Sequence, residues 1–185
     1  AAGGARMTSV GEALVRGLEA RGVDHVFGIP GVHTLGLYRG LEGSGIRHVT
    51  PRHEQGAGFM ADGFGRVAGR PGVAFTISGP GLTNVLTPIG QARHDATPLL
   101  VVSASVAREA RGRRLGVIHD LPDQAAATRA LTRLTVTVDD PAALAGALED
   151  AFDVLEGRAG PPGPVHIEVP VDVLRLPAAP AAAPA

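Results

Sequence analysis

The most informative stretch of this chain is residues 51–66, PRHEQGAGFMADGFGR. It follows an extended run at residues 46–49 and opens a predicted helix, so Glu54 is expected where a strand gives way to a helix N-terminus. Four glycines interrupt this helix: Gly56, Gly58, Gly63 and Gly65. Each costs about 1 kcal/mol relative to alanine, and close approach of the backbone to another helix or to a ligand is the usual compensation. We therefore expect a tightly packed helix with a carboxylate at its mouth.

Predicted strands alternate with predicted helices along the chain. Strands are predicted at residues 24–29, 46–49, 73–77, 99–102, 134–138 and 165–169. The runs at 73–77 and 99–102 are short and apolar, which is typical of strands covered on both faces. Besides the glycine-rich stretch, helices are predicted around residues 10–18, 34–41 and 82–93 and from Pro141 onward. Residues 108–123 have no period and are predicted to form a loop. This alternation predicts an α/β fold, a three-layer sandwich with a parallel sheet of about six strands and helices on both faces.

Length and composition indicate the domain organisation. A chain of 185 residues with 44% hydrophobic content favours one domain with a sizeable core. We assign this domain to residues 7–176, preceded at 1–6 by a tag remnant or disordered leader and followed at 177–185 by a linker of only Pro and Ala. A net charge of −1 gives no reason to expect nucleic acid or an anionic membrane as partner. No apolar run approaches the roughly 18 residues of a membrane span.

The chain contains no cysteine, which excludes disulfides, thiolate chemistry and cysteine metal sites. A cytoplasmic location is compatible with this composition and is our expectation. Five histidines lack the spacing of metal ligands: His25, His48, His53, His94 and His166. We interpret them as structural, with His53 open only because it adjoins Glu54, and predict no metal ligand in this chain.

Four motifs resemble, in order and spacing, those of thiamine-diphosphate-dependent enzymes. Arg52–Ala57, continued by Ala61–Gly63 and Arg66, is similar to the segment that activates the cofactor. FGIPG at 27–31 is similar to the family's first strand-to-helix turn, and SGPGLTN at 78–84 is similar to its Gly-Pro-Gly turn with the trailing Asn. GPVHIEVPVDV at 163–173 is similar to the segment that closes the family's first domain. The resemblance covers about residues 7–175 and is strongest to the acetolactate synthase and 2-oxo acid decarboxylase branch. It implies the domain that binds the cofactor's pyrimidine.

Glu54 has two interpretations. By residue type alone it is a carboxylate that complements the helix dipole, which is worth about 0.3–1 kcal/mol. The resemblance implies instead a catalytic, cofactor-binding residue that bonds the N1′ nitrogen of the aminopyrimidine and promotes loss of the proton on the thiazolium C2. That role requires a buried carboxylate with a raised pKa, so that the group shares a proton near neutral pH.

The resemblance implies further residues around the cofactor. Beside Glu54, the pyrimidine pocket is expected to contain Pro30, Gly31, Gly81 and Asn84. By residue type alone these positions are tight turns, although bare glycines also let a ring approach closely. On the substrate side we expect Val32, His33, His119 and Gln124. Residue type alone makes each of the four an ordinary loop residue.

The diphosphate half of the motif set is missing. The family holds Mg²⁺ and the diphosphate with a Gly-Asp-Gly segment followed by an Asn, and no Gly-Asp-Gly occurs in this chain. The resemblance therefore implies a fragment or a split subunit, which is inactive by itself and needs a diphosphate-binding domain or subunit as partner. Thiamine diphosphate is the expected cofactor, Mg²⁺ is expected on the missing part, and a small 2-oxo acid is the expected substrate.

Positions where the sequence differs from the family's motifs indicate which branch of the family it resembles. Ile77 stands where some simple decarboxylases carry a catalytic His, which favours an acetolactate-synthase-like enzyme that decarboxylates or joins 2-oxo acids. Residues 28–34 and 116–121 also resemble the guanidino-oxo-acid decarboxylases. One alternative is a non-catalytic partner subunit or degenerate binding domain, against which the intact Glu54 argues. Another is an unrelated doubly wound nucleotide-binding domain, which would need a Gly-x-Gly-x-x-Gly turn that residues 28–31 do not supply.

The glycine-rich helix also suggests how the chain assembles. By 3, 4, 7 spacing, one face combines small and large apolar residues: Gly56, Phe59, Met60, Gly63, Phe64 and Val67. Full burial of one Phe is worth about 1.5–3 kcal/mol, so an exposed stripe of this kind favours a partner and we expect a homodimer. The alternative is that the stripe covers the domain's own sheet.

Overall fold

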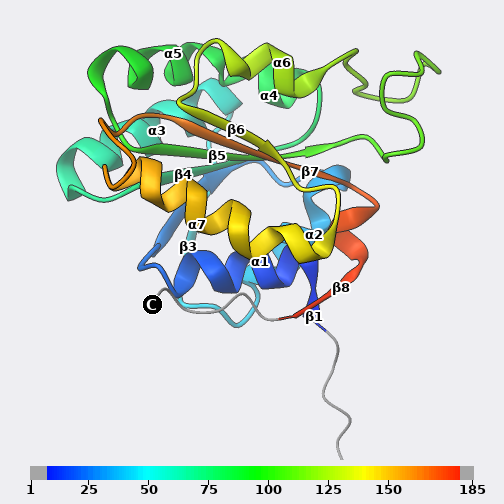
Figure 1. Cartoon of the computed structure of the whole chain (residues 1–185), viewed down its shortest axis with the longest axis horizontal. Coiled ribbons are helices and arrows are strands. Elements are labelled where there is room, and N and C mark those ends of the chain that lie inside the picture. The colour runs from blue at the N-terminus through cyan, green and yellow to red at the C-terminus, as the bar shows by residue number, and fades with distance from the viewer. Residues whose placement is uncertain (1–7, 180–185) are drawn as a thin grey trace, which may run out of the picture.

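The computed structural model describes residues 8–179, and its centre is a six-stranded sheet (Figure 1). The strands are β2 (His25–Gly28), β3 (Arg47–Val49), β4 (Gly72–Thr76), β5 (Leu99–Ser105), β6 (Leu134–Thr137) and β7 (Val165–Pro170). They lie in the order β3-β2-β4-β5-β7-β6, and every neighbouring pair is parallel. Each predicted strand is found at its expected place.

Helices cover both faces of the sheet (Figure 1). One face carries α1 (Val10–Glu19), α2 (Leu35–Leu41) and α7 (Leu144–Leu155). The other carries α3 (Glu54–Ala68), α4 (Pro80–Asn84), α5 (Leu86–Asp95) and α6 (Gln124–Arg129). The described part of the chain also contains three short 3-10 helices, namely η1 (Val32–Thr34), η2 (Pro141–Ala143) and η3 (Val173–Arg175). The predicted three-layer α/β sandwich is confirmed.

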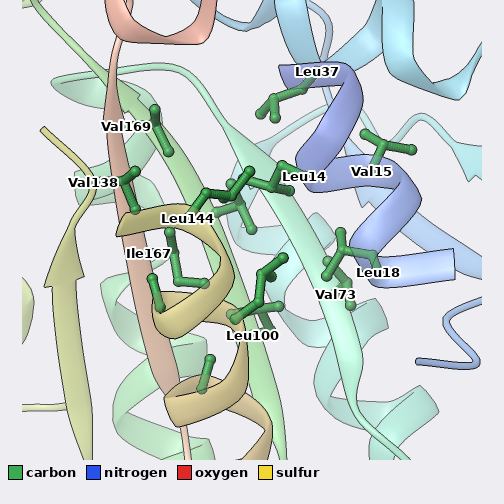
Figure 2. Packing of buried hydrophobic residues seen from close by; sticks show 14 of the residues in the cluster. Leu14, Val15, Leu18, Leu37, Val73, Leu100, Val138, Leu144, Ile167 and Val169 are labelled. Carbon is green, nitrogen blue, oxygen red and sulfur yellow. The ribbon is translucent and has the colours of Figure 1, made fainter. Parts of the chain in front are cut away.

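The core has one apolar layer on each face of the sheet. The larger lies under α1, α2 and α7, where Figure 2 shows Leu14, Leu18 and Leu144 directed toward Val73 and Leu100 of the sheet. The smaller lies under α3 and α5 and includes Ala57, Ala61, Ala74, Ile89 and Val101. Strands β4 and β5 are buried along their whole length, as their unbroken apolar character predicts for central parallel strands.

The start of α3 is fixed by its neighbours in the sequence. His53 is the N-cap, and its Nδ1 accepts a hydrogen bond from the Gln55 N–H at 3.1 Å. This bond satisfies one of the donors that a helix N-terminus leaves free. At the other end Gly69, with φ of 64°, is the left-handed residue that closes many helices. Glu54 is therefore the first residue of the helix, as predicted.

Packing explains two of the four glycines inside α3. A Cβ on Gly58 would overlap Pro88 of α5, and a Cβ on Gly65 would press against the carbonyl of Pro98. The close approach of another helix therefore compensates for the glycine at position 58. No such contact explains Gly63, where a Cβ would have no heavy atom within 4 Å.

The helix predicted over residues 82–93 is two helices. α4 ends at Asn84 and α5 begins at Leu86, with Val85 between them at φ −96° and ψ 2°. Pro88 gives the reason, because it has no N–H to bond the carbonyl four residues earlier and is tolerated only in a first turn. The loop predicted over residues 108–123 has no helix or strand. It leads directly into α6, a helix that was not predicted.

A second sheet joins the two ends of the described chain. β1 (Thr8–Ser9) pairs antiparallel with β8 (Pro177–Ala178). The tail predicted as a linker therefore begins with two paired residues. Residues 180–185 and the predicted leader at 1–6 lie outside the described residues. Within residues 8–179 no helix is long and apolar enough to cross a membrane, and the cytoplasmic location stays a prediction.

Candidate functional site

Most of the predicted residues lie at one edge of the sheet. The carboxyl ends of parallel strands meet at a common edge, where ligands bind in many open α/β folds. The turn after β2 contains Gly31 and His33, the turn after β4 contains residues 78–81, and the loop after β5 contains His119. α3 begins with Glu54 just after β3. This edge lies at the right of Figure 1, where the loop after β5 extends beyond the sheet.

Glu54 and Asn84 form a pair at this edge. Glu54 is half-buried at the start of α3, and half-buried Asn84 is the last residue of α4. The Asn84 Nδ2 group donates a hydrogen bond to Glu54 Oε2 at 2.9 Å. This bond fixes one carboxylate oxygen, so Oε1 is the oxygen left for a ligand. Thirty residues separate the two positions in the sequence, and the short helix α4 brings them together.

Ile77 lies between the two glycine turns. A Cβ on Gly31 would overlap the Cγ2 of Ile77, and a Cβ on Gly81 would lie 2.5 Å from its Cγ1. The absence of side chains at both glycines is therefore required by Ile77 itself. Ile77 is only half-buried, so it also presents apolar surface at this edge.

Gly79 has a backbone conformation that only glycine adopts without strain. Its φ is 59° and its ψ is −115°. Its Cα lies against the carbonyl of His119, which a Cβ would overlap. The turn after β4 is thus covered by the loop after β5, and this contact brings His119 from a distant part of the sequence to the site.

His33, Ser78 and His119 form a second group. The Nδ1 of His33 and the Oγ of Ser78 are 2.5 Å apart. The His33 and His119 rings meet edge to face, with centroids separated by 5.7 Å. Burial lowers the pKa of His33, and nearby His119 and Arg175 lower it further. At neutral pH the His33 ring is therefore uncharged.

His119 has a positive φ of 63°. Such a backbone is uncommon for a residue other than glycine and is often found at functional sites. The nearby side chains of Val117 and Ile118 are exposed, Ile118 at 68%. Val32 is 70% exposed beside His33, and Pro30 is exposed as well. Apolar surface therefore flanks the two imidazoles.

Gln124 lies behind the turn after β4 and away from solvent. It is only 5% exposed, and its Oε1 accepts a hydrogen bond from the Gly79 N–H at 2.9 Å. Its Nε2 donates to Ser103 Oγ at 3.1 Å and to the Ala104 carbonyl at 2.8 Å. The resemblance placed Gln124 on the substrate side, whereas the structure shows its amide directed into the interior.

The predicted residues thus form two groups joined by one turn. Glu54 and Asn84 lie together, as do His33 and His119, and residues 78–81 connect them. Sequence reasoning overlooked the roles of Ser78 and Ile77. Ser78 belongs to the quoted turn motif, but nothing in the sequence signals its pairing with a histidine 45 positions earlier. Within residues 8–179, no three His, Asp or Glu side chains are arranged to hold a metal ion.

Comparison with known proteins identifies the same family that the sequence motifs resemble. Residues 8–127 match the family described as "Thiamine pyrophosphate enzyme, N-terminal TPP binding domain". The chain is 53% identical over 171 residues to a "Probable 2-ketoarginine decarboxylase" of Pseudomonas aeruginosa, an alignment that covers 92% of this chain and 30% of that protein.

Two further relatives are acetolactate synthases. The chain is 40% identical over 169 residues to the large subunit from Corynebacterium glutamicum, covering 91% of this chain and 26% of that subunit. It is 36% identical over 163 residues to the chloroplastic enzyme of Arabidopsis thaliana, covering 88% of this chain and 24% of that enzyme. The chain thus spans less than a third of the length of these relatives.

Proposed function

Because this chain belongs to the thiamine pyrophosphate enzymes, as their N-terminal TPP-binding domain, we propose that it forms the pyrimidine-binding half of an active site. The complete enzyme acts on a small 2-oxo acid by decarboxylation, by carboligation or by both. The relatives support this range, since they include both a decarboxylase and acetolactate synthases. Thiamine diphosphate, when bound, supplies the carbon nucleophile that attacks the 2-oxo group.

The observation that carries this proposal is the Glu54–Asn84 pair. Asn84 holds Oε2 of the carboxylate at 2.9 Å, so Oε1 is free to hold a proton against a ring nitrogen of the pyrimidine. The surroundings fit a flat heterocycle, because Ile77 and the glycine turns at 31 and 81 provide an apolar edge without bulky side chains. Glu54 is the catalytic residue in this proposal, and Asn84 orients it.

The substrate side is assigned to the second group. His33 and His119, with Val32 and the neighbouring apolar loop residues, form the wall that faces the 2-oxo acid. The uncharged His33 ring can accept or donate one hydrogen bond at the substrate. The higher identity to the decarboxylase, 53% against 40% for the Corynebacterium synthase, favours a 2-oxo acid of the 2-ketoarginine kind over pyruvate.

The other wall of the site belongs to a part of the enzyme outside this chain. Half-buried Glu54 needs a second surface to exclude water, and diphosphate with Mg²⁺ needs oxygen ligands. We assign both to the diphosphate-binding domain or subunit. We further propose that two copies of this chain assemble as a homodimer, as the exposed face of α3 suggests.

Substitution of Glu54 tests the function. In the enzyme assembled with its diphosphate-binding part, Glu54→Gln keeps the shape of the side chain but cannot exchange a proton. We expect turnover to fall at least about 100-fold, as is typical for an acid–base group. Exchange of the C2 proton of the bound cofactor, followed by NMR, should slow in parallel. The control is Glu42→Gln at the exposed end of α2, and wild-type exchange in Glu54→Gln would refute the assignment.

A further inference from the structure

Gln124 is a buried polar side chain with an unusual set of partners. It is the first residue of α6 and only 5% exposed. Burial of an amide is costly unless the amide is hydrogen-bonded. Gln124 meets this requirement with bonds to Gly79, Ser103 and Ala104, and its side chain also bonds the buried Glu168 carboxylate of β7. These bonds connect α6 both to β5 and to the turn after β4.

The Nε2 end of the side chain is anchored in the sheet. Nε2 donates to Ser103 Oγ and to the Ala104 carbonyl, both on β5. Ser103 Oγ lies 2.8 Å from His166 Nε2 on β7, and His166 Nδ1 lies 2.8 Å from Thr128 Oγ1 in α6. The chain of contacts thus returns to the helix that carries Gln124. Because β5 and β7 are buried along their length, this end of the amide has a rigid support.

The Oε1 end holds the turn. It accepts the Gly79 N–H at 2.9 Å, while the His119 carbonyl lies against the Gly79 Cα. Gly79 is therefore fixed from two sides in a conformation that only glycine adopts readily. Both hydrogens of Gln124 Nε2 are used inside the protein, so the amide has no donor left for a substrate.

The position of Gly79 determines that of Asn84. Gly79 is the N-cap of α4, and its carbonyl accepts the Thr83 N–H at 2.9 Å in the first turn. α4 ends at Asn84, whose Nδ2 donates to Glu54 Oε2. A shift of the turn would therefore move the amide that orients the carboxylate.

We propose that Gln124 is a positioning residue that holds Gly79, and through α4 holds the Asn84 amide against Glu54. This inference rests on the proposed function and deepens it. In this proposal Gln124 does not contact the substrate directly. It acts on the catalytic carboxylate of Glu54 indirectly, by holding the turn at Gly79 in place.

A double-mutant cycle in the assembled holoenzyme tests the proposal. Gln124→Met keeps the length of the side chain and removes its hydrogen bonds, including the one to Glu168. We expect kcat to fall about 10-fold while KM for the 2-oxo acid stays within about twofold. In an Asn84→Ala background the same substitution should cost less than about twofold, because both residues act on Glu54. The control is Gln91→Met on the exposed side of α5, where Gln91 donates a hydrogen bond to Asp95 of the same helix. We expect this control to leave both constants unchanged.

Two kinetic outcomes would overturn the proposal. A raised KM with unchanged kcat would show that Gln124 contacts the substrate. Equal losses of kcat with and without Asn84 would show that the two residues act independently. If Gln124→Met does not fold, Ser103→Ala removes one anchor but keeps the Gly79 bond, and it should give a smaller loss of kcat with the same dependence on Asn84. An Asn84-independent loss in that variant would equally overturn the proposal.

Hydrogen–deuterium exchange gives a readout that does not depend on activity. In the holoenzyme, the peptide spanning residues 78–84 should exchange faster in Gln124→Met and stay unchanged in Gln91→Met. Unchanged exchange in Gln124→Met would overturn the positioning role even if kcat fell. The proposed function fails by a different result, namely wild-type turnover in Glu54→Gln, and the exchange experiment still tests the hold on Gly79 in that case.

Discussion

His166 is fully buried between β5 and α6. Both ring nitrogens have hydroxyl partners at 2.8 Å, Ser103 on one side and Thr128 on the other. Burial lowers the pKa of His166 to about 3 from an ordinary value of 6.5, because the charged imidazolium would lose its hydration. The folded protein therefore holds this ring neutral at any pH where the unfolded chain begins to protonate it.

This difference in pKa predicts how stability depends on pH. Between pH 6.5 and about 3, the unfolded chain binds a proton at His166 that the folded chain does not. The free energy of unfolding should therefore fall as pH falls through this window, by up to about 1.4 kcal/mol per pH unit. His166→Gln keeps a donor and an acceptor but does not titrate, so its urea-unfolding free energy should change less between pH 7 and pH 4.5.

His94→Gln is the matched control, because the His94 side chain is 84% exposed. This variant should follow the wild-type pH dependence. If His166→Gln also ran parallel to wild type, the neutral state of His166 would not be a source of acid sensitivity.

At the scale of elements, α3 and α5 illustrate why glycine is placed where a helix meets its neighbour. Gly58 lies against Pro88 with no room for a Cβ, and Pro88 itself occurs where α5 can accept a residue without an N–H. The buried face of α3 consists of small residues and Asp62, which accepts two bonds from Arg66 at 2.8 and 3.2 Å. Arg66 in turn binds Asp95 of α5 at 2.6 Å. Close packing and this ion pair together hold the two helices.

Substitution of Gly58 should separate packing from helix propensity. Gly58→Ala is expected to destabilise the fold by about 1–3 kcal/mol, since overpacking outweighs the better propensity of alanine. Gly146→Ala in α7 is the matched change, because a Cβ there has no heavy atom within 4 Å. That substitution should stabilise the fold by roughly 0.5–1 kcal/mol. Urea unfolding of both variants measures the difference. Equal effects of the two substitutions would show that the Pro88 contact is not tight.

The elements could be predicted from the sequence where one local signal dominated. The short extended segments between helical patterns predicted all six strands of the main sheet, and the glycine-rich motif predicted α3 with Glu54 at its start. The break between α4 and α5 was missed because the helical period continues across Val85. α6 was missed because its six residues are too few to show a period. Its first residue, Gln124, is ordered by bonds to distant strands, which local sequence cannot reveal.

The candidate site likewise has residues that local motifs identify and residues that only distant contacts bring together. Glu54 and Asn84 were identified through motifs, and the structure brings them to 2.9 Å. The contacts among His33, Ser78 and His119 depend on how the loop after β5 folds over Gly79. That loop has no period and contains left-handed residues at Gly112, Arg114, Gly116 and His119. Its path is therefore set by tertiary contacts, which is why the role of Ser78 could not be anticipated.

At the scale of the whole molecule, the outer face of α3 has one apolar side chain that packs against the domain and three that are exposed to solvent. Phe64 packs back onto the domain, with its ring centroid 6.1 Å from that of Phe27. Phe59, Met60 and Val67 are 41%, 44% and 91% exposed. The interpretation that the stripe covers the domain's own sheet thus applies to Phe64 alone. A contiguous group of exposed large apolar residues is a feature of interaction surfaces, whereas single exposed apolar residues are normal.

We therefore predict that the chain self-associates through this face of α3. Gly63 lies on the same face and has open space above it, which would allow a second helix to approach. Burial of one Phe is worth about 1.5–3 kcal/mol, so two copies meeting here gain from each exposed residue twice. Val67→Glu adds a charge where the side chain is most exposed and should leave the fold intact. It should raise the dimer Kd at least about 10-fold, which corresponds to about 1.4 kcal/mol.

Light scattering over micromolar concentrations measures this association for wild type and variant. The matched control is Leu115→Glu, because Leu115 is 57% exposed in the loop after β5 and far along the chain from α3. That variant should keep the wild-type mass at every concentration. A wild-type chain that stays monomeric, or a Val67→Glu variant that dimerises as well as wild type, would show that α3 does not form the interface. The second result would direct the search for the interface to other surfaces. The first would indicate that the exposed apolar residues of α3 contact the diphosphate-binding domain or subunit that we propose as partner.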